Sequence, residues 1–103
     1  MTNYVQQIKD ALKELHPRMD SELLDVYALL VLVKGEDVTL KDVHDAWSVW
    51  KNNIRPDHRS LIEFDELTPE VQALDQKYAD SIRLVAKIKE AVSAYKAKES
   101  GTL

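Results

Sequence analysis

The apolar side chains of this chain recur every three or four residues over four separate stretches. In the first stretch they lie at positions 5, 8, 12 and 15, after Thr2 and Asn3 and before His16-Pro17. This spacing places them on one face of an α-helix. We therefore predict an amphipathic helix over residues 3–15, capped by Thr2 or Asn3. His16 is expected to interact with the carbonyl groups at the end of that helix.

The second stretch is apolar at nearly every position from Leu23 to Val33. Asp20 is placed to cap a helix here, and Lys34-Gly35 supplies the cation and the glycine that often end one. A short apolar run fits a buried strand as well, and residues 31–33 are strand-like. The length and the cap favour a helix. A helix that is apolar on all sides is expected at the centre of the core.

The third stretch carries both tryptophans. Its apolar side chains lie at positions 40, 43, 47, 50 and 54, which again form one face of a helix. Thr39, followed three residues later by Asp42, resembles a capping box, and Pro56 disfavours helix at the residue before it. We predict a helix over residues 40–53. Trp47 and Trp50 are expected in the core, with Trp50 better placed to form the floor of a pocket as well.

A connector over residues 55–66 follows, and its apolar residues Leu61 and Phe64, with Leu67 after it, are expected to anchor it to the core. Thr68-Pro69-Glu70 is then a typical helix start. No helix breaker follows before Gly101. A continuous helix of about 30 residues spans about 45 Å, whereas a domain of this size has a radius of gyration of about 13 Å. The last helix therefore either bends or extends beyond the globule.

One apolar stripe continues along the far part of this last helix. We call it the distal stripe; its residues are Val85, Ile88, Val92 and Tyr95. Two alternatives remain open: the stripe pairs with a second copy of the chain to form a homodimer, or it packs on the first helix. Residues 97–103 are expected to fray.

Together these patterns predict an all-α protein: a single small four-helix domain over residues 1–103, with a long C-terminal helix and one ordered connector. The chain has only two glycines, whereas all-β folds need many tight turns. Leu30, Trp47 and Leu74 are expected to meet at the centre of the core.

Composition narrows the classes of function. The chain has no cysteine, which excludes disulfides and thiolate metal sites. Its net charge is −4, and its basic residues are interspersed with acids, which disfavours nucleic-acid binding. The longest apolar run, residues 26–33, is too short to cross a membrane, and the polar N-terminus is unlike a signal sequence. We expect a cytoplasmic protein.

Neither a metal site nor a catalytic site is indicated. His44 and His58 lack the partner spacing that metal sites need, and no serine stands in a G-x-S-x-G setting. Asp65-Glu66 is explained by its place just before a helix N-terminus. We expect no cofactor and no enzymatic activity, because no nucleophile, base and stabiliser occur together.

The acidic chain contains one local cluster of basic residues. Lys51, Arg55, His58 and Arg59 follow Trp50 within ten positions, and we call these five residues the basic patch. One interpretation is a solvated loop. The alternative is a site for an anion or an acidic surface beside Trp50, where guanidinium groups can pair with phosphate or carboxylate.

Three motifs in residues 24–86 resemble a group of small uncharacterised proteins of actinobacteriophages, of the mycobacteriophage type. The motifs are Val43-His44-x-Ala46-Trp47, His58-x-Ser60-Leu61 and Phe64-Asp65-Glu66-Leu67. The connector and the Pro-Glu helix start that follows it also resemble the helical module of ryanodine-receptor (RyR) repeats. The chain lacks the Gly-Trp-x-x-Gly segment of those repeats, and Arg59 replaces their proline.

The phage resemblance implies a protein that acts in the cytoplasm of the host cell. Our leading prediction is a non-enzymatic phage accessory protein that binds a host or phage protein. The RyR resemblance suggests a small-ligand module, which would bind a nucleotide-like anion at Trp50, Arg55, His58 and Arg59. A self-assembling structural protein is the third alternative.

Overall fold

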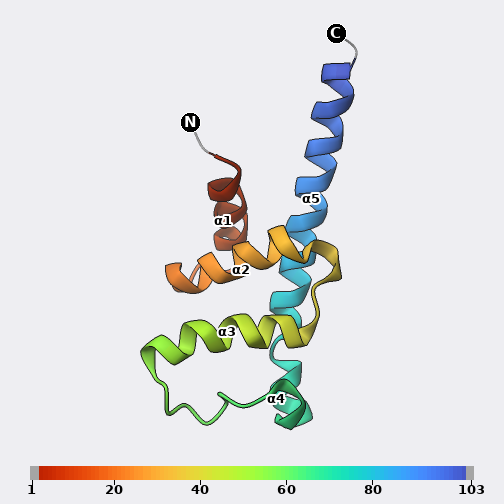
Figure 1. Ribbon diagram of the computed structural model, residues 1–103. Coiled ribbons are helices and arrows are strands. Elements are labelled where there is room, and N and C mark those ends of the chain that lie inside the picture. Colours follow the sequence, from red (N-terminus) through yellow and green to blue (C-terminus); the bar gives the residue numbers. More distant parts are fainter. Residues whose placement is uncertain (1–2, 102–103) are drawn as a thin grey trace.

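The computed structural model describes the backbone of residues 3–101 and the side chains of residues 3–92 (Figure 1). None of residues 3–101 lies in a strand. The elements are α1 (Tyr4–Leu15), α2 (Ser21–Val33), η1 (Gly35–Asp37), α3 (Leu40–Ile54), η2 (Phe64–Glu66), α4 (Pro69–Ala73) and α5 (Gln76–Gly101). This confirms the predicted all-α class, with four helices of which the last is long and is bent between α4 and α5.

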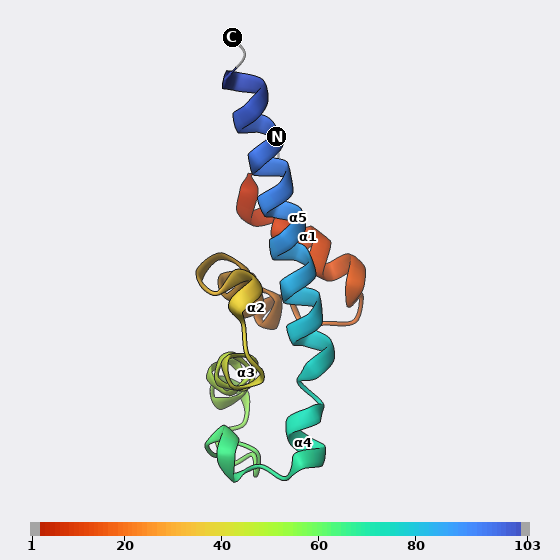
Figure 2. The ribbon, with the colours of Figure 1, turned by 90° about the vertical axis from the view of Figure 1, so that its right-hand side faces the viewer.

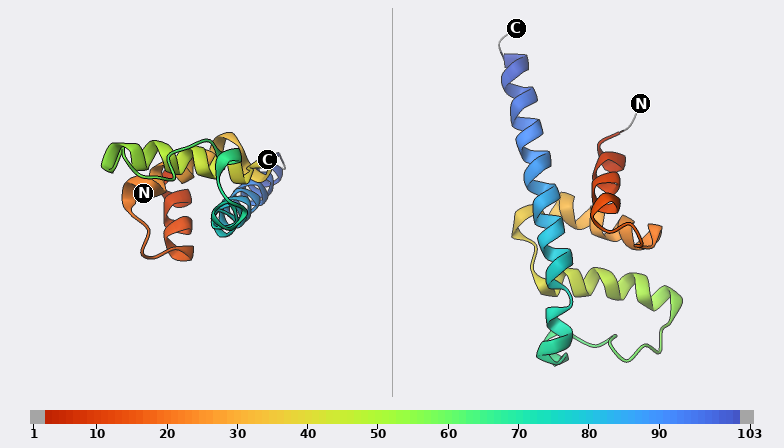
Figure 3. Two further views of the ribbon diagram at one scale, coloured as in Figure 1. Left: turned by 90° about the horizontal axis from the view of Figure 1, so that it is seen from below. Right: turned by 180° about the vertical axis from the view of Figure 1, so that it is seen from behind.

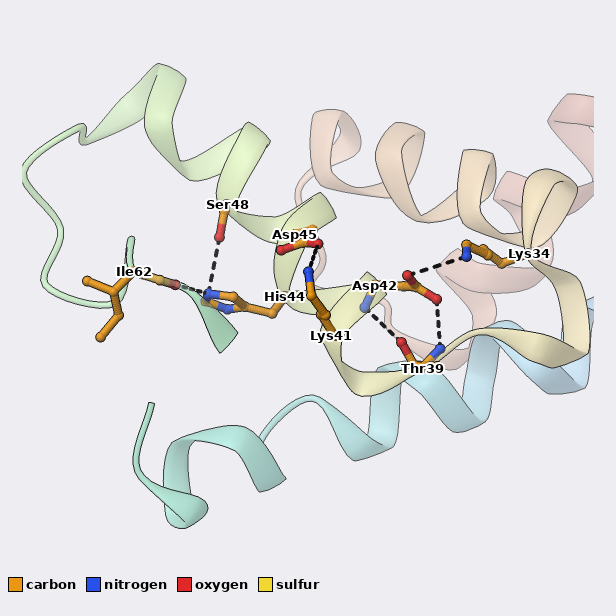
Figure 4. Close-up of polar contacts among 8 residues, drawn as sticks. All are labelled: Lys34, Thr39, Lys41, Asp42, His44, Asp45, Ser48 and Ile62. Atoms are coloured by element: carbon orange, nitrogen blue, oxygen red, sulfur yellow. Dashed lines mark hydrogen bonds and ion pairs between the residues drawn. The ribbon is translucent and has the colours of Figure 1, made fainter. Parts of the chain in front are cut away.

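Local side chains fix where the helices begin. Asn3 accepts a hydrogen bond from the backbone N–H of Gln6 at 2.8 Å, and Asp20 accepts one from Glu22 at 2.8 Å. At α3 the Thr39 hydroxyl accepts from the Asp42 N–H at 3.1 Å, while the Asp42 carboxylate accepts from the Thr39 N–H at 3.0 Å (Figure 4). This reciprocal pair is the capping box that the sequence predicts.

The helices form a thin, elongated molecule with dimensions of 56 × 26 × 19 Å. Helices α2 and α3 lie one above the other, and both cross α5 (Figures 1 and 2). Helix α1 packs on α2 and α5, and the C-terminal part of α5 extends beyond the other helices (Figure 3). The radius of gyration is therefore 15.5 Å, larger than the value of about 13 Å that is typical of a compact domain of this length.

The core lies where four helices meet. Leu12 of α1, Tyr27 of α2, Val43 of α3 and Ile82 of α5 are almost completely buried. Val38, in the link between α2 and α3, is equally buried. Because each helix contributes one of these side chains, the core joins segments that are up to 70 positions apart (82 − 12 = 70).

The last helix bends where α4 meets α5, which is one of the two alternatives that the sequence left open. The last turn of α4 tightens through hydrogen bonds from Leu74 N–H to Val71 and from Asp75 N–H to Gln72, and α5 starts with a bond from the Ala79 N–H to the Asp75 carbonyl. Asp75 is a residue type that favours helix starts over helix interiors. It therefore begins a new helix instead of continuing the old one.

This break also corrects the predicted centre of the core. Leu30 is buried and Trp47 is half-buried against the core, but Leu74 is 65% exposed. Leu74 lies in the turn between α4 and α5, outside the regular spacing that would have directed its side chain inward. Ile82, two turns further along α5, is fully buried in its place.

Helix α2 lies at the centre of the core, as predicted, because α1, α3 and α5 all contact it, but it is not covered on every side. The segment is a helix and not a strand, and Gly35 follows it with a φ of 58°, which suits glycine at a helix C-terminus. However, Leu29 is 57% exposed and Val33 is 64% exposed. Neighbouring helices cover α2 only where α1, α3 and α5 contact it, and its remaining face is open in so thin a molecule.

The connector between α3 and α4 is ordered by specific contacts. The Gln72 side chain donates a hydrogen bond to the Phe64 carbonyl at 2.9 Å. The Nε2–H of His44 donates to the Ile62 carbonyl at 2.7 Å, as Figure 4 shows. Leu67 is buried at the end of the connector. The predicted apolar anchoring is thus supplemented by hydrogen bonds from α3 and α4.

Candidate functional site

A cavity of about 650 Å³ lies where the loop between α1 and α2 meets α3 and the start of α5. We call it the basic cavity. Its aromatic wall consists of Trp47, Trp50 and Tyr78, and its charged or titratable lining consists of His16, Arg18, Asp20, Lys51 and Lys77. Leu15, Pro17, Met19 and Leu23 complete the lining. The cavity thus combines apolar rings with cations that come from three parts of the chain.

Two of these cations rest on aromatic faces. The Lys51 ammonium lies 5.2 Å from the centroid of the Trp50 ring, and the Lys77 ammonium lies 5.0 Å from that of Tyr78. These distances are typical of cation–π contacts, which at exposed sites contribute about 0.5–1 kcal/mol. The indole Nε1 of Trp50 is buried and has no hydrogen-bond partner. It is an unused donor on a residue that lines the cavity.

His16 joins the cavity to α5. The Ser81 hydroxyl donates to the Lys77 carbonyl at 3.0 Å, so the Nε2–H of His16, 2.8 Å from the Ser81 oxygen, is the donor of that second bond. Burial, and then the nearby charge of Lys77, lower the pKa of His16 below its ordinary value. The imidazole is therefore held in its neutral form more firmly than a free histidine.

This geometry corrects the expected role of His16. Its backbone N–H does bond to the Leu12 carbonyl at the end of α1. The side chain instead turns to Ser81 and packs beside Tyr78, with the ring centroids 5.0 Å apart. The reason is tertiary, because α5 passes the end of α1 and offers a hydroxyl group there.

The cations of the basic cavity have no carboxylate partners. Within residues 3–92, neither Arg18, Lys51 nor Lys77 forms an ion pair, whereas five other cations do. The one acid in the lining, Asp20, accepts a hydrogen bond from the N–H of Glu22 at the start of α2. Its charge is therefore directed at least partly toward the helix terminus.

The structure divides the predicted basic patch. Trp50 and Lys51 line the basic cavity, while His58 lines a neighbouring cavity of about 360 Å³ that shares the Trp47, Lys77 and Tyr78 walls. Arg55 and Arg59 are exposed and line neither cavity. The ring of His58 meets Trp47 edge-on, 5.2 Å away.

The charges of the patch nevertheless act on one group. Burial, followed by the charges of Lys51, Arg55 and Arg59, lowers the pKa of His58. The ion pair of Arg55 with Asp57 is long, at 3.8 Å, and both side chains are mostly in solvent. His58 itself is oriented by the backbone N–H of Ser60, which donates to its Nδ1 at 3.0 Å. The patch is thus a set of cations around one oriented imidazole.

The distal stripe is covered only in part. Val85 is buried in the protein's own core, whereas Ile88 is 54% exposed and Val92 is 47% exposed. These two residues, with Tyr4 and Ile8 of α1, line a groove of about 200 Å³ between α1 and α5. The side chain of Tyr95 lies outside the described residues. Helix α1 therefore covers the near end of the stripe and leaves the next two residues accessible.

His44 has a structural role, because it ties α3 to the connector. It is buried in α3, where its Nε2 bonds to the Ile62 carbonyl and lies 3.4 Å from the Ser48 hydroxyl (Figure 4). Residues 3–92 contain no group of three or more His, Asp or Glu side chains placed to hold a metal ion. Within the same part of the chain, no helix is long and apolar enough to cross a membrane.

The residues that sequence reasoning missed are Arg18, Lys77 and Tyr78. They line the basic cavity together with Trp50 and Lys51, although 59 positions separate the first two (77 − 18 = 59). No spacing rule connects an arginine in a short loop with a lysine in the last helix. Only the packing of α5 against α1 and α3 brings them to one cavity.

Comparison with known proteins places the chain in a family. The chain belongs to the family described as "Domain of unknown function (DUF7701)", whose family model matches residues 3–87. No curated protein and no solved structure matches the chain. The matched residues include α1 to α4 and the first part of α5, and therefore every residue that lines the basic cavity.

Proposed function

We propose that this member of the family is a non-enzymatic phage accessory protein that binds an acidic region of a host or phage protein in the host cytoplasm. One observation carries the proposal: Lys51, Arg55 and Arg59 lie together at the end of α3 and the start of the connector, with both arginines exposed. This concentration of positive charge occurs in a chain whose net charge is −4. A positive local potential on a molecule of negative net charge attracts an acidic partner to this one face.

The chemistry of this face also fits protein binding. Arg59 forms no ion pair within residues 3–92, and Arg55 holds only its long, exposed pair with Asp57. Ile54, at the end of α3, is more than half exposed beside them. Arginine is enriched where proteins bind one another, because a guanidinium group can form a bidentate pair with a carboxylate.

These arginines are available for binding because folding does not depend on them. Both side chains are exposed, and substitutions at such positions usually change stability by less than about 0.5 kcal/mol. The capping box and the buried Val43 and His44 lie in the first half of α3, whereas both arginines follow its last residue. A charge reversal at positions 55 and 59 is therefore expected to alter binding without unfolding the chain.

The test is affinity capture from infected host cells with a paired set of variants. The unchanged chain is compared with Arg55→Glu/Arg59→Glu, and captured proteins are quantified by mass spectrometry after nuclease treatment. We expect the partner recovered with the unchanged chain to decrease at least about tenfold with the double variant, as loss of charge-assisted pairs implies. Nuclease treatment should leave the capture unaltered, because the partner is a protein.

The matched control is Lys87→Glu/Lys89→Glu, which changes the net charge equally but lies on α5. Capture by this control should remain close to that of the unchanged chain, and circular dichroism should show all three chains folded. Equal loss with both double variants would mean that only the total charge matters. Undiminished capture with Arg55→Glu/Arg59→Glu would mean that these residues form a solvated loop.

A further inference from the structure

The basic cavity collects cations that the rest of the fold leaves unpaired. Arg18 comes from the loop between α1 and α2, Lys51 from the end of α3 and Lys77 from the start of α5. None of the three forms an ion pair within residues 3–92. Three like charges beside one cavity repel each other, so an anion bound between them would relieve that repulsion.

The two histidines beside the aromatic wall lie near these cations. Burial first, and then the charge of Lys77, lowers the pKa of His16, and burial followed by the charge of Lys51 and the two arginines lowers the pKa of His58. Asp20 is the only acid in the lining of the basic cavity, and its carboxylate caps α2. The positive charge of the cavity is thus not balanced by the chain's own carboxylates.

The remaining lining selects for a ring. Trp47, Trp50 and Tyr78 present aromatic surface, and Leu15 and Leu23 add apolar surface beside them. A volume of about 650 Å³ lies within the range of about 300–1,000 Å³ that is usual for small-molecule sites. A simple inorganic anion would leave this apolar surface uncovered, whereas a planar base would stack on it.

We propose that the basic cavity binds a nucleoside diphosphate, with its base against the tryptophan and tyrosine rings and its phosphates among Arg18, Lys51 and Lys77. The face around Arg55 and Arg59 that is proposed above to bind an acidic region of a protein is called the docking face. The nucleotide site goes beyond it, since it uses Arg18 and Lys77 in place of Arg55 and Arg59. Arginine can pair with phosphate through two parallel hydrogen bonds, and the two lysine ammonium groups act as mobile point charges.

The experiment uses the full chain and three probes: ADP, adenosine and inorganic phosphate. Binding is measured by isothermal titration calorimetry and by the fluorescence of Trp47 and Trp50, both of which line the cavity. We expect ADP to bind and to change the tryptophan emission, and its affinity to fall as salt concentration rises. Adenosine and inorganic phosphate should each bind at least about tenfold more weakly, because each offers only half of the interactions.

Single-site variants locate the ligand. Arg18→Ala and Lys77→Ala should each weaken ADP binding about tenfold or more, the usual loss for a hydrogen bond to a charged group. Lys87→Ala is the matched control, because Lys87 is also an exposed cation of α5 with no ion pair among residues 3–92, but it lies outside the cavity. It should bind ADP as the unchanged chain does. Circular dichroism checks that each variant is folded.

The results separate this site from the docking face. Arg55→Glu/Arg59→Glu should bind ADP within about threefold of the unchanged chain, since solvent and salt screen charges outside the cavity. No binding of ADP at millimolar concentration would overturn the proposal. So would adenosine or phosphate binding as tightly as ADP, or an equal effect of Lys77→Ala and Lys87→Ala. None of these outcomes affects the proposed docking face, whose test is protein capture.

Discussion

Replacing Ile82 by alanine is the most direct test of how α5 is held in the fold. Ile82 is fully buried, in a core that also contains Leu12, Tyr27 and Val43 from the other three helices. Leu74 lies eight positions earlier and is 65% exposed. Ile82→Ala and Leu74→Ala each remove three carbon atoms, so the pair compares the same chemical change at a buried and at an exposed position.

The burial of each side chain sets the expected magnitude. Three buried carbon groups at about 0.8 kcal/mol each correspond to about 2.4 kcal/mol of lost transfer free energy for Ile82→Ala. The space left behind raises the expected loss to about 3–4 kcal/mol, within the range seen for such core truncations. For Leu74 only about a third of the transfer term applies, which gives about 0.8 kcal/mol.

The assay is urea unfolding of the unchanged chain and both variants, followed by far-ultraviolet circular dichroism and by tryptophan fluorescence. We expect Ile82→Ala to lose a large part of a total stability of about 5–15 kcal/mol, with little change in the dependence on urea. Leu74→Ala should unfold close to the unchanged chain. Equal losses for the two variants, or a loss below about 1 kcal/mol for Ile82→Ala, would refute this placement of α5.

Three further predictions follow from the geometry. The pKa of His16 is lowered in the folded state, so on acidification below pH 6.5 the unfolded chain takes up a proton at this histidine before the folded chain does. The free energy of unfolding should therefore decrease as the pH falls through this range. The urea midpoint, measured as a function of pH, should decrease less steeply for His16→Gln. Burial raises the pKa of Asp75, so the ionised carboxylate destabilises the fold at neutral pH. Asp75→Asn should therefore raise the urea midpoint at pH 7, and a lower midpoint would contradict this reasoning. The exposed Ile88 and Val92 are expected to join two copies; light scattering should give a dimer for the unchanged chain and a folded monomer for Ile88→Asp/Val92→Asp, and a monomer in both cases would exclude this interface.

The starts and ends of the helices could be predicted from sequence because short-range contacts determine them. The Thr39 and Asp42 capping box, the Asp20 cap and the Thr68 cap before Pro69 each join residues two or three positions apart. Such contacts form between neighbours in the chain whatever the rest of the fold does. The all-α class follows from the same local signals.

The burial of each helix could not be predicted in the same way. The apolar pattern of α2 correctly indicated a central helix, but it did not indicate that Leu29 and Val33 are exposed because neighbours cover only part of the helix. The run after Thr68 allowed a bend in the last helix but did not indicate its position, and the turn before Asp75 leaves Leu74 outside the regular spacing. Which face of a helix is buried depends on how many neighbouring helices pack against it. The spacing of apolar residues along one helix does not give the number of its neighbours.

The candidate site shows the same division. The cluster of charge after Trp50 is visible in the sequence, since Lys51, Arg55 and Arg59 lie within nine positions (59 − 50 = 9). The convergence of Arg18 and Lys77 on Lys51 is not visible, because those residues are separated by whole helices. Only the crossing of α5 over α1 and α3 decides that they line one cavity, since side chains distant in sequence meet only through tertiary packing.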